Sequence, residues 1–212
     1  MNPRIPFVAA SLVIPVVTSR VYQAANRNWQ ATPEEQQMAL PGDDVLPRSA
    51  PPTTMAITID APPADVWPWL VQMGVDRAGL YTRTWVENGI FRLGVVNANR
   101  IVPEWQDLRI GDTIAFVRDT PKRPGFGPKV VHLDPGRELT VCMGETPATS
   151  LMTWQFVLLP LPGGRTRLLL RSRSNRDRPL AMKAFDFLFE AGYTYMDIGM
   201  LRGIRDRVAH HR

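Results

Sequence analysis

Two glutamates close to tryptophans have the clearest capacity for proton chemistry. Glu87 follows Trp85 by two positions, and Glu104 lies between a proline and a tryptophan. A carboxylate held against an indole ring is partly desolvated, which raises its pKa and suits it to general acid or base catalysis. Glu87 and Glu104 are therefore the candidate catalytic residues. The alternative for either is a surface glutamate or an ion pair, with Arg83 or Arg100 as the partner.

Other catalytic signatures are missing from the sequence. It has no Gly-x-Ser-x-Gly nucleophile motif and no P-loop, and its three histidines form no His-x-x-x-His pair. His132 falls in a predicted strand, where a structural histidine is the favoured interpretation. Cys142 is the only cysteine and lies in an apolar run, which excludes an intrachain disulfide and a cysteine-rich zinc site. We expect no metal and no cofactor.

Aromatic side chains are the candidate walls of a ligand pocket. The chain has six tryptophans, most of them between positions 67 and 154. Pockets for small molecules are mostly apolar, and tryptophan often lines them. The candidate pocket residues are Trp69, Tyr81, Trp85, Trp105, Trp154, Phe156, Tyr195 and Met196. Ordinary core packing is the alternative for each of them.

Two arginines share one face of a predicted strand. If Arg171 and Arg173 point inward, they can hold an anionic group of a ligand. The favoured interpretation places both on the outer face, where their guanidinium groups are solvated.

Three glycines share one face of the predicted C-terminal helix. Gly192, Gly199 and Gly203 each destabilise a helix by roughly 1 kcal/mol relative to alanine. Their clustering indicates close backbone packing, for which the sheet is the favoured partner, or space left for a ligand.

The elements that must position these residues follow from local patterns. Hydrophobic alternation predicts strands over 54–59, 113–117, 130–133, 138–143, 151–159 and 166–174. Prolines and a glycine delimit a helix over 62–74, a short helix covers 82–88, and helical spacing extends over 179–210. Pro68 either kinks the first helix or lies in its first turn, if Asp65 is the cap. This order predicts an α+β fold, with a curved antiparallel sheet covered by a long C-terminal helix.

The N-terminal region divides into two parts before this domain. Residues 1–28 contain the apolar run Ile5–Val17, which is short for a membrane-spanning helix of ~20 residues. A membrane anchor, an export signal and a packing helix all remain open, and so does the localisation. Residues 29–52 form a helical arm, with Thr32 as N-cap and Glu35 completing a capping box, and end in a proline-rich linker. The main domain is expected over 53–212.

Composition is that of a globular protein with a mild positive charge. Of 212 residues, 44% are hydrophobic and 21% charged, and the net charge is +5. The arginines are dispersed, so a solvated basic surface is favoured, although anionic lipid remains a partner that this charge permits. Nucleic acid is not expected, because no basic motif is interleaved with exposed aromatic residues.

Several motifs together resemble bacterial members of the SRPBCC superfamily, the START and polyketide-cyclase-like proteins. The motifs are ITIDAPP at 57–63, VWPWLVQ at 66–72, RAGLY at 77–81, NANRIVPEWQ at 97–106 and GD at 111–112. The resemblance extends from about Thr32 to the C-terminus. It implies a helix-grip fold, with a cavity between a curved sheet and the C-terminal helix. The sequence departs from the pattern at Arg83, where an aromatic residue is common, and at Asn99, where aspartate is common.

The resemblance implies binding of lipids, sterols, polyketides or other hydrophobic molecules, and in some members cyclisation or aromatisation. The first hypothesis is therefore a binding protein for a small hydrophobic ligand. The second is a cyclase-like or isomerase-like enzyme that uses Glu87 or Glu104. The third is a membrane-associated lipid-handling protein, in which the apolar N-terminus and the basic C-terminal tail dock on anionic lipid.

Overall fold

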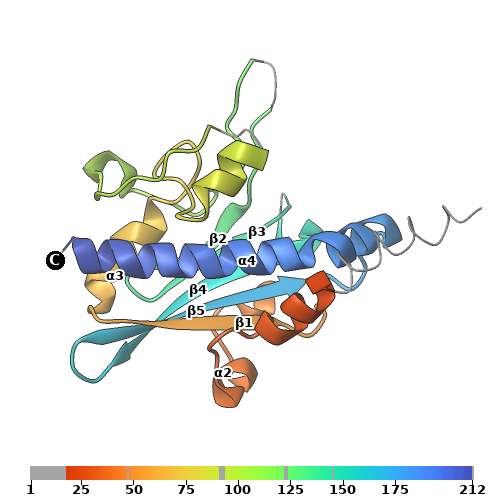
Figure 1. The fold of residues 1–212 in the computed structure, drawn as a ribbon, viewed down its shortest axis with the longest axis horizontal. Helices are drawn as coiled ribbons and strands as arrows, with labels where there is room; N and C mark the ends of the chain where they lie inside the picture. The colour runs from red at the N-terminus through yellow and green to blue at the C-terminus, as the bar shows by residue number, and fades with distance from the viewer. Residues whose placement is uncertain (1–17, 47, 91–93, 122–123, 145, 212) are drawn as a thin grey trace, which may run out of the picture.

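One long helix lies along one face of a five-stranded antiparallel sheet (Figure 1). The computed structural model describes residues 18–46, 48–90, 94–121, 124–144 and 146–211. The strands are β1 (Thr53–Ile59), β2 (Lys129–Asp134), β3 (Glu138–Cys142), β4 (Met152–Leu161) and β5 (Arg165–Ser174). Their order in the sheet is β1-β5-β4-β3-β2. The long helix is α4 (Leu180–His210). This is the expected α+β arrangement of a helix-grip fold.

Turn chemistry sets the register of the longest strands. β4 and β5 pair over ten residues each, from Leu161 opposite Arg165 to Met152 opposite Ser174. Gly163 and Gly164 connect them with φ angles of +80° and +67°, which glycine adopts without steric strain. The predicted hairpin is confirmed. Residues 113–117 differ from the prediction, because they form isolated bridges at Thr113 and Val117 rather than a strand.

The main hydrophobic core lies between the concave face of the sheet and the C-terminal half of α4. The helix contributes residues spaced three and four apart, which places them on one side. These are Ile198, Leu201, Ile204 and Val208. The concave face contributes Ile57, Leu139, Phe156 and Leu170 to the same core. Alternation along the strands sends these side chains to one face of the sheet.

Helix α3 (Pro63–Val71) closes one end of this core and buries Val66, Trp69 and Leu70. It begins directly after Pro62, so Pro68 lies inside the helix rather than in its first turn. A cap at Asp65 is therefore wrong. The short helix predicted over 82–88 begins at residue 84 and continues as a wide turn at Val86–Ile90.

The N-terminal arm covers the opposite, convex face. Helix α2 (Pro33–Gln37) begins with the predicted capping box, in which Thr32 and Glu35 exchange hydrogen bonds. Leu40 packs with Ala56, Val157 and Leu169 in a second apolar cluster on that face. The arm also contains the short helix η1 (Asp43–Val45). Other short helical turns are η3 (Pro103–Trp105) and η4 (Pro147–Thr149).

Residues 18–26 are helical and run beside the N-terminal half of α4, where Arg20 pairs with Glu190 at 2.8 Å. The apolar run Ile5–Val17 lies outside the described residues. Within the parts of the chain that the structure describes, no helix combines the length and hydropathy needed to cross a bilayer.

Candidate ligand site between the sheet and the C-terminal helix

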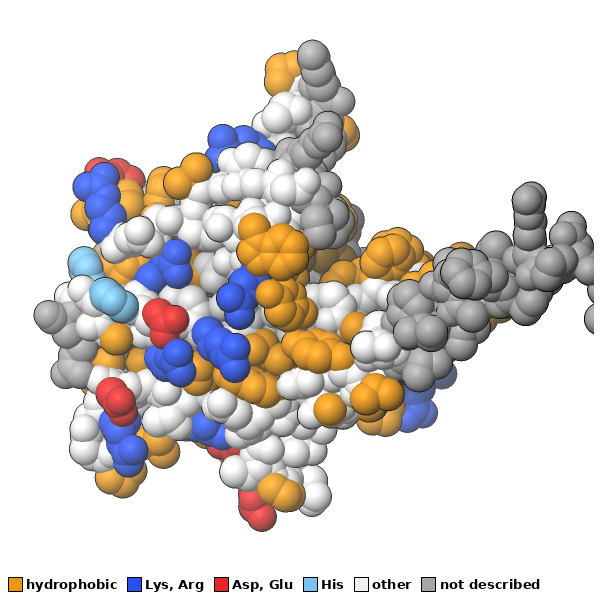
Figure 2. All heavy atoms as spheres, in the orientation of Figure 1, with side chains coloured by type: hydrophobic (Ala, Val, Ile, Leu, Met, Phe, Trp, Pro, Cys, Tyr) orange, Lys and Arg blue, Asp and Glu red, His pale blue; other side chains and the backbone are white. Residues whose placement is uncertain are grey.

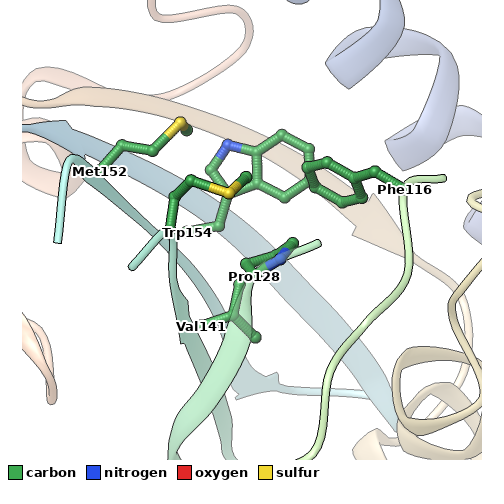
Figure 3. Close-up of a pocket in the computed structure, with 6 residues that line it drawn as sticks. Phe116, Pro128, Val141, Met152 and Trp154 are labelled. Atoms are coloured by element: carbon green, nitrogen blue, oxygen red, sulfur yellow. The ribbon is translucent and has the colours of Figure 1, made fainter. Parts of the chain in front are cut away.

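A small apolar hollow opens at the end of the sheet where β5 leaves toward α4. Its cavity volume is only about 10 Å³, and it is lined by Phe116, Pro128, Val141, Met143, Met152 and Trp154. The rings of Trp154 and Phe116 lie beside one another on the same side of it (Figure 3), with centroids 5.2 Å apart. Pockets for small molecules measure roughly 300–1,000 Å³. A ligand of that size therefore requires the walls to move.

Of the predicted pocket residues, Trp154 lines this hollow and Phe156 lies directly behind it. Both project from the concave face of β4, because they are two positions apart on one strand. The ring of Phe156 is fully buried and meets Trp154 edge-on, with centroids 6.1 Å apart. Trp154 is half-buried and forms the boundary between the packed core and the hollow.

Tyr195 and Met196 are half-buried on the middle of α4. The guanidinium of Arg83 lies 5.3 Å from the centroid of the Tyr195 ring. The Nε of Arg83 is buried and has no hydrogen-bond partner. Burial also raises the pKa of the nearby Tyr22 phenol, with a further contribution from Tyr195. The residue that departs from the family pattern is thus enclosed between α4 and the loop before Val86.

Trp69 and Tyr81 lie in the packed core at the α3 end. Their rings meet edge-on at 5.8 Å. The Nε2 of Gln72 donates a hydrogen bond to the Tyr81 hydroxyl at 3.0 Å. Burial raises the pKa of Tyr81 well above its usual range. On the other side of Trp69 lies His211, with its ring centroid 5.7 Å away.

The glycines of α4 pack on a loop rather than on the sheet. A side chain at Gly203 would lie 2.1 Å from the carbonyl oxygen of Tyr81, so only glycine fits there. Gly199 lies against the side chain of Arg83, and Gly192 faces open space. Close packing is confirmed at Gly203. The favoured partner was wrong, because the sheet lies on the other side of the helix from these glycines.

Three predicted site residues lie toward the surface. Trp85 is 61% exposed, and Glu104 is exposed. Trp105 is partly buried and packs against the main core from the outside. None of the three lines the hollow.

Glu87 is the buried member of the two candidate carboxylates. Its Oε1 accepts a hydrogen bond of 2.5 Å from the hydroxyl of Thr82, and its Oε2 is buried without a partner. The alternative interpretation was a surface glutamate or an ion pair with Arg83 or Arg100. Glu87 is 3% exposed, and among the described residues no ion pair joins it to either arginine.

A third carboxylate, which the sequence interpretation missed, lies on the inner side of α4. Asp197 is 9% exposed, and no hydrogen bond or ion pair reaches it from the described residues. Its neighbours at helical spacing, Thr194 and Leu201, are also buried. Burial raises the pKa of Asp197 from 3.8 to about 7. The available signal was one acidic residue in phase with the apolar positions 198, 201 and 204.

Two other candidate groups have structural contacts. His132 Nδ1 lies 2.7 Å from Oε2 of the buried Glu138, and Thr140 donates to the other oxygen of that carboxylate at 2.5 Å. Cys142 is buried in β3. Among the described residues, no three histidine, cysteine or acidic side chains gather as they do around a metal ion.

The convex face holds a buried arginine rather than the solvated one that was expected. Arg171 is 1% exposed, because the arm covers it. Its guanidinium pairs with Asp43 at 2.8 Å and donates to the carbonyl oxygens of Glu35 and Met38 at the end of α2. Arg173 also pairs with Asp43. Strand alternation assigned both arginines to the outer face, but it contained no information on what covers that face.

Comparisons with known proteins find similar folds at low similarity. A crystal structure of a Rhodobacter sphaeroides protein has 18% identity, with 77% of this chain and 98% of that chain covered and a TM-score of 0.47. A Nitrosomonas europaea protein has 16% identity, 79% and 97% coverage and a TM-score of 0.45. CalU16 from Micromonospora echinospora has 13% identity, 75% and 84% coverage and a TM-score of 0.33. No model of a protein family matches the sequence, and the search of curated proteins found no match.

The structure itself has the element order of the helix-grip class. One strand, helical segments, four antiparallel strands and a long C-terminal helix follow in sequence. The curved sheet and α4 enclose the core between them (Figure 1). The resemblance to the SRPBCC superfamily is thus confirmed at the level of the fold. A fold hosts many functions, so the function must be argued from the site.

Proposed function

We propose that this protein binds a small, mostly apolar molecule between the concave face of the sheet and α4. The observation that supports this most directly is the hollow beside Trp154, whose lining is entirely apolar. Ligand pockets combine such walls with a few polar groups. Asp197 does not line this hollow, but it is buried on the inner side of α4, and we propose it as the polar group that a ligand between the sheet and α4 would meet.

The walls of the hollow are suited to widening around a ligand. Met143 and Met152 are half-buried, and methionine has three rotatable bonds and adapts to irregular shapes. Phe116 comes from the loop that replaces the expected strand over 113–117, so no sheet pairing fixes it on both sides. Movement of these side chains enlarges the space without breaking the sheet.

Native mass spectrometry of the full chain, purified from its source cell, tests the proposal, with extraction of any retained compound. Uptake of a fluorescent fatty-acid probe supplies a quantitative measure. Met152→Trp fills the hollow and is expected to weaken probe binding about tenfold, the loss of roughly 1.4 kcal/mol. Met38→Trp, a matched change on the exposed surface of the arm, should bind as the wild type does. A wild-type protein that is empty and takes up no probe contradicts the proposal, and so does unchanged binding by Met152→Trp.

Acid–base catalysis in the same space is a second candidate function, and Asp197 is the observation that favours it. Cyclisation and isomerisation need a proton to be removed and returned, and a carboxyl with a pKa near 7 does both efficiently at neutral pH. With the extracted compound as substrate, Asp197→Asn should retain binding and lose turnover. Glu87→Gln is the parallel variant for the originally predicted carboxylate. Full turnover by both variants would exclude these two residues as the acid or base.

A further inference from the structure

The two halves of α4 differ in their surroundings. The C-terminal half packs on the sheet, whereas the N-terminal half extends past the sheet at the end opposite α3 (Figure 1). Six large hydrophobic residues in this half are between 46% and 80% exposed: Leu180, Phe185, Phe187, Leu188, Phe189 and Tyr193. We name these six residues the α4 apolar surface. Hydrophobic side chains are visible along the course of the helix in Figure 2.

The α4 apolar surface is too wide for an ordinary amphipathic helix. At 100° per residue, its side chains extend over an arc of about 240°, whereas the apolar stripe of a helix on a globular protein is about 100° wide or somewhat more. Phe185 and Phe189 stack on one another with centroids 4.3 Å apart, so they do not pack into the domain. A helix that is apolar over most of its circumference is stable when an apolar medium surrounds it.

The charges of this half do not oppose contact with an anionic lipid surface. Each of its carboxylates is neutralised by an arginine: Asp186 by Arg178, and Glu190 by Arg20. Lys183 is exposed and has no ion pair with the described residues. A basic group beside apolar side chains favours the interface of an anionic bilayer.

The position at which the apolar run joins the described chain indicates that the partner of the α4 apolar surface is a lipid bilayer. Ile5–Val17 leads directly into Thr18, and Arg20 lies 4.4 Å from the centroid of the Phe187 ring. The most apolar part of the sequence therefore connects to the chain beside the α4 apolar surface. The basic C-terminal tail lies at the other end of α4, where His211 contacts Trp69, about 36 Å from Phe187 at 1.5 Å per residue.

We propose that the α4 apolar surface is a membrane-docking site, which inserts at the interface of a lipid bilayer next to the point where residues 1–17 join the chain. The basic C-terminal tail, which the sequence suggested as the second contact, takes no part because it lies at the opposite end of α4. This proposal does not depend on the bound ligand, since the α4 apolar surface and the hollow share no residue.

Co-sedimentation of the full-length protein with vesicles tests this docking site. The vesicles are phosphatidylcholine with and without phosphatidylglycerol. The double substitution Phe185→Asp and Phe189→Asp should reduce the partition coefficient about a hundredfold, at about tenfold for each phenylalanine that leaves the bilayer. The matched control is Ile110→Asp with Phe126→Asp, at two residues that are similarly exposed elsewhere. The control protein should bind vesicles as the wild type does.

Three results would overturn the proposal. The first is a wild type with no affinity for either vesicle, the second is an α4 variant that binds as tightly as the control, and the third is an equal loss of binding by both variants. Sedimentation velocity without lipid tests whether a second copy of the chain covers this surface instead. If the wild type is a dimer that does not bind vesicles, and Phe185→Asp with Phe189→Asp converts it to a monomer, the surface is a dimer interface. If circular dichroism shows that the double variant is unfolded, Leu180→Asp at the most exposed of the six positions replaces it.

Discussion

A buried ionisable residue lies on each side of the sheet, and the two residues differ in whether they have hydrogen-bond and ion-pair partners. On the convex face, Arg171 has an ion pair with Asp43 and hydrogen bonds to Thr54 and to carbonyl oxygens of the arm. On the concave face, Asp197 has no partner among the described residues. A buried charge without partners is expensive, and the usual response is a pKa shift that neutralises it.

This difference separates a structural role from a functional one. The guanidinium of Arg171 satisfies carbonyl oxygens at the end of α2, which the helix itself leaves without donors. It attaches the arm to the sheet, and it leaves no polar atom for a ligand. Asp197 makes no such contact with the described residues, so the proposed ligand is the partner that its carboxyl could meet. The following predictions test this contrast.

The largest effect is expected from breaking the convex-face ion pairs. Asp43→Ala leaves Arg171 buried without its counter-charge and also removes the partner of Arg173. The free energy of unfolding should fall by about 3 kcal/mol, as it does when one partner of a buried pair is lost. Urea denaturation measures this. Asp177→Ala breaks the exposed pair with Arg48 and should change stability by no more than about 0.5 kcal/mol. Equal effects of the two variants would contradict a structural role for Arg171.

A smaller and pH-dependent effect is expected on the concave face. The pKa of Asp197 is 3.8 in its ordinary state and about 7 in the folded protein. Between those values the folded state binds a proton that the unfolded state lacks, so stability falls as the pH rises from about 4 to about 7. Asp197→Asn removes this loss. After allowance for relaxation around the charge, the variant should be about 2 kcal/mol more stable than the wild type at pH 8.

The measurement is urea denaturation of wild type and Asp197→Asn at pH 5 and at pH 8. The stability gain at pH 5 should be less than half of the gain at pH 8, because pH 5 lies in the lower part of the range between the unfolded and folded pKa values. Asp206→Asn is the control, since that aspartate is exposed on the same helix and pairs with Arg205. A gain of the same size at both pH values would mean that the Asp197 carboxyl is not desolvated.

The smallest effect is expected where the arm meets the edge of the convex face. Hydrogen bonds from Arg167 lower the pKa of Glu35, with a weaker contribution from the capping contact at Thr32. A lowered carboxyl pKa stabilises the fold above the ordinary value of 4.5 and loses that contribution as the pH falls. Glu35→Gln should therefore lower stability by about 1 kcal/mol at pH 7, because the pair is partly solvated.

The two faces should thus respond to acid in opposite directions. Acidification removes the contribution of Glu35 and relieves the penalty at Asp197. The Glu35→Gln difference should shrink as the pH falls from 7 toward 3, when measured by thermal unfolding. Asp44→Asn, at an exposed carboxylate of the same arm, is the matched control. If the stability difference between wild type and Glu35→Gln grows as the pH falls, the pKa of Glu35 is not lowered by Arg167.

Local signals predicted most of the elements. The glycines at 163 and 164 predicted the β4–β5 hairpin, Thr32 and Glu35 predicted the start of α2, and helical spacing predicted α4. Each signal acts within a few residues, because turns, caps and periodicity depend on neighbouring backbone. The strand over 113–117 was not formed, because strand pairing depends on partners that are distant in sequence.

The sequence by itself determined the order of elements, the helix-grip class and the residues that share each strand face. Only the tertiary structure decided which face the arm covers, and therefore that Arg171 is paired and buried while Asp197 is buried and alone. It also decided that Trp154 borders a hollow while Trp69 is filled core. The physical reason is that burial and pairing depend on elements more than 100 residues apart, such as Asp43 and Arg171, whose contact no local pattern specifies.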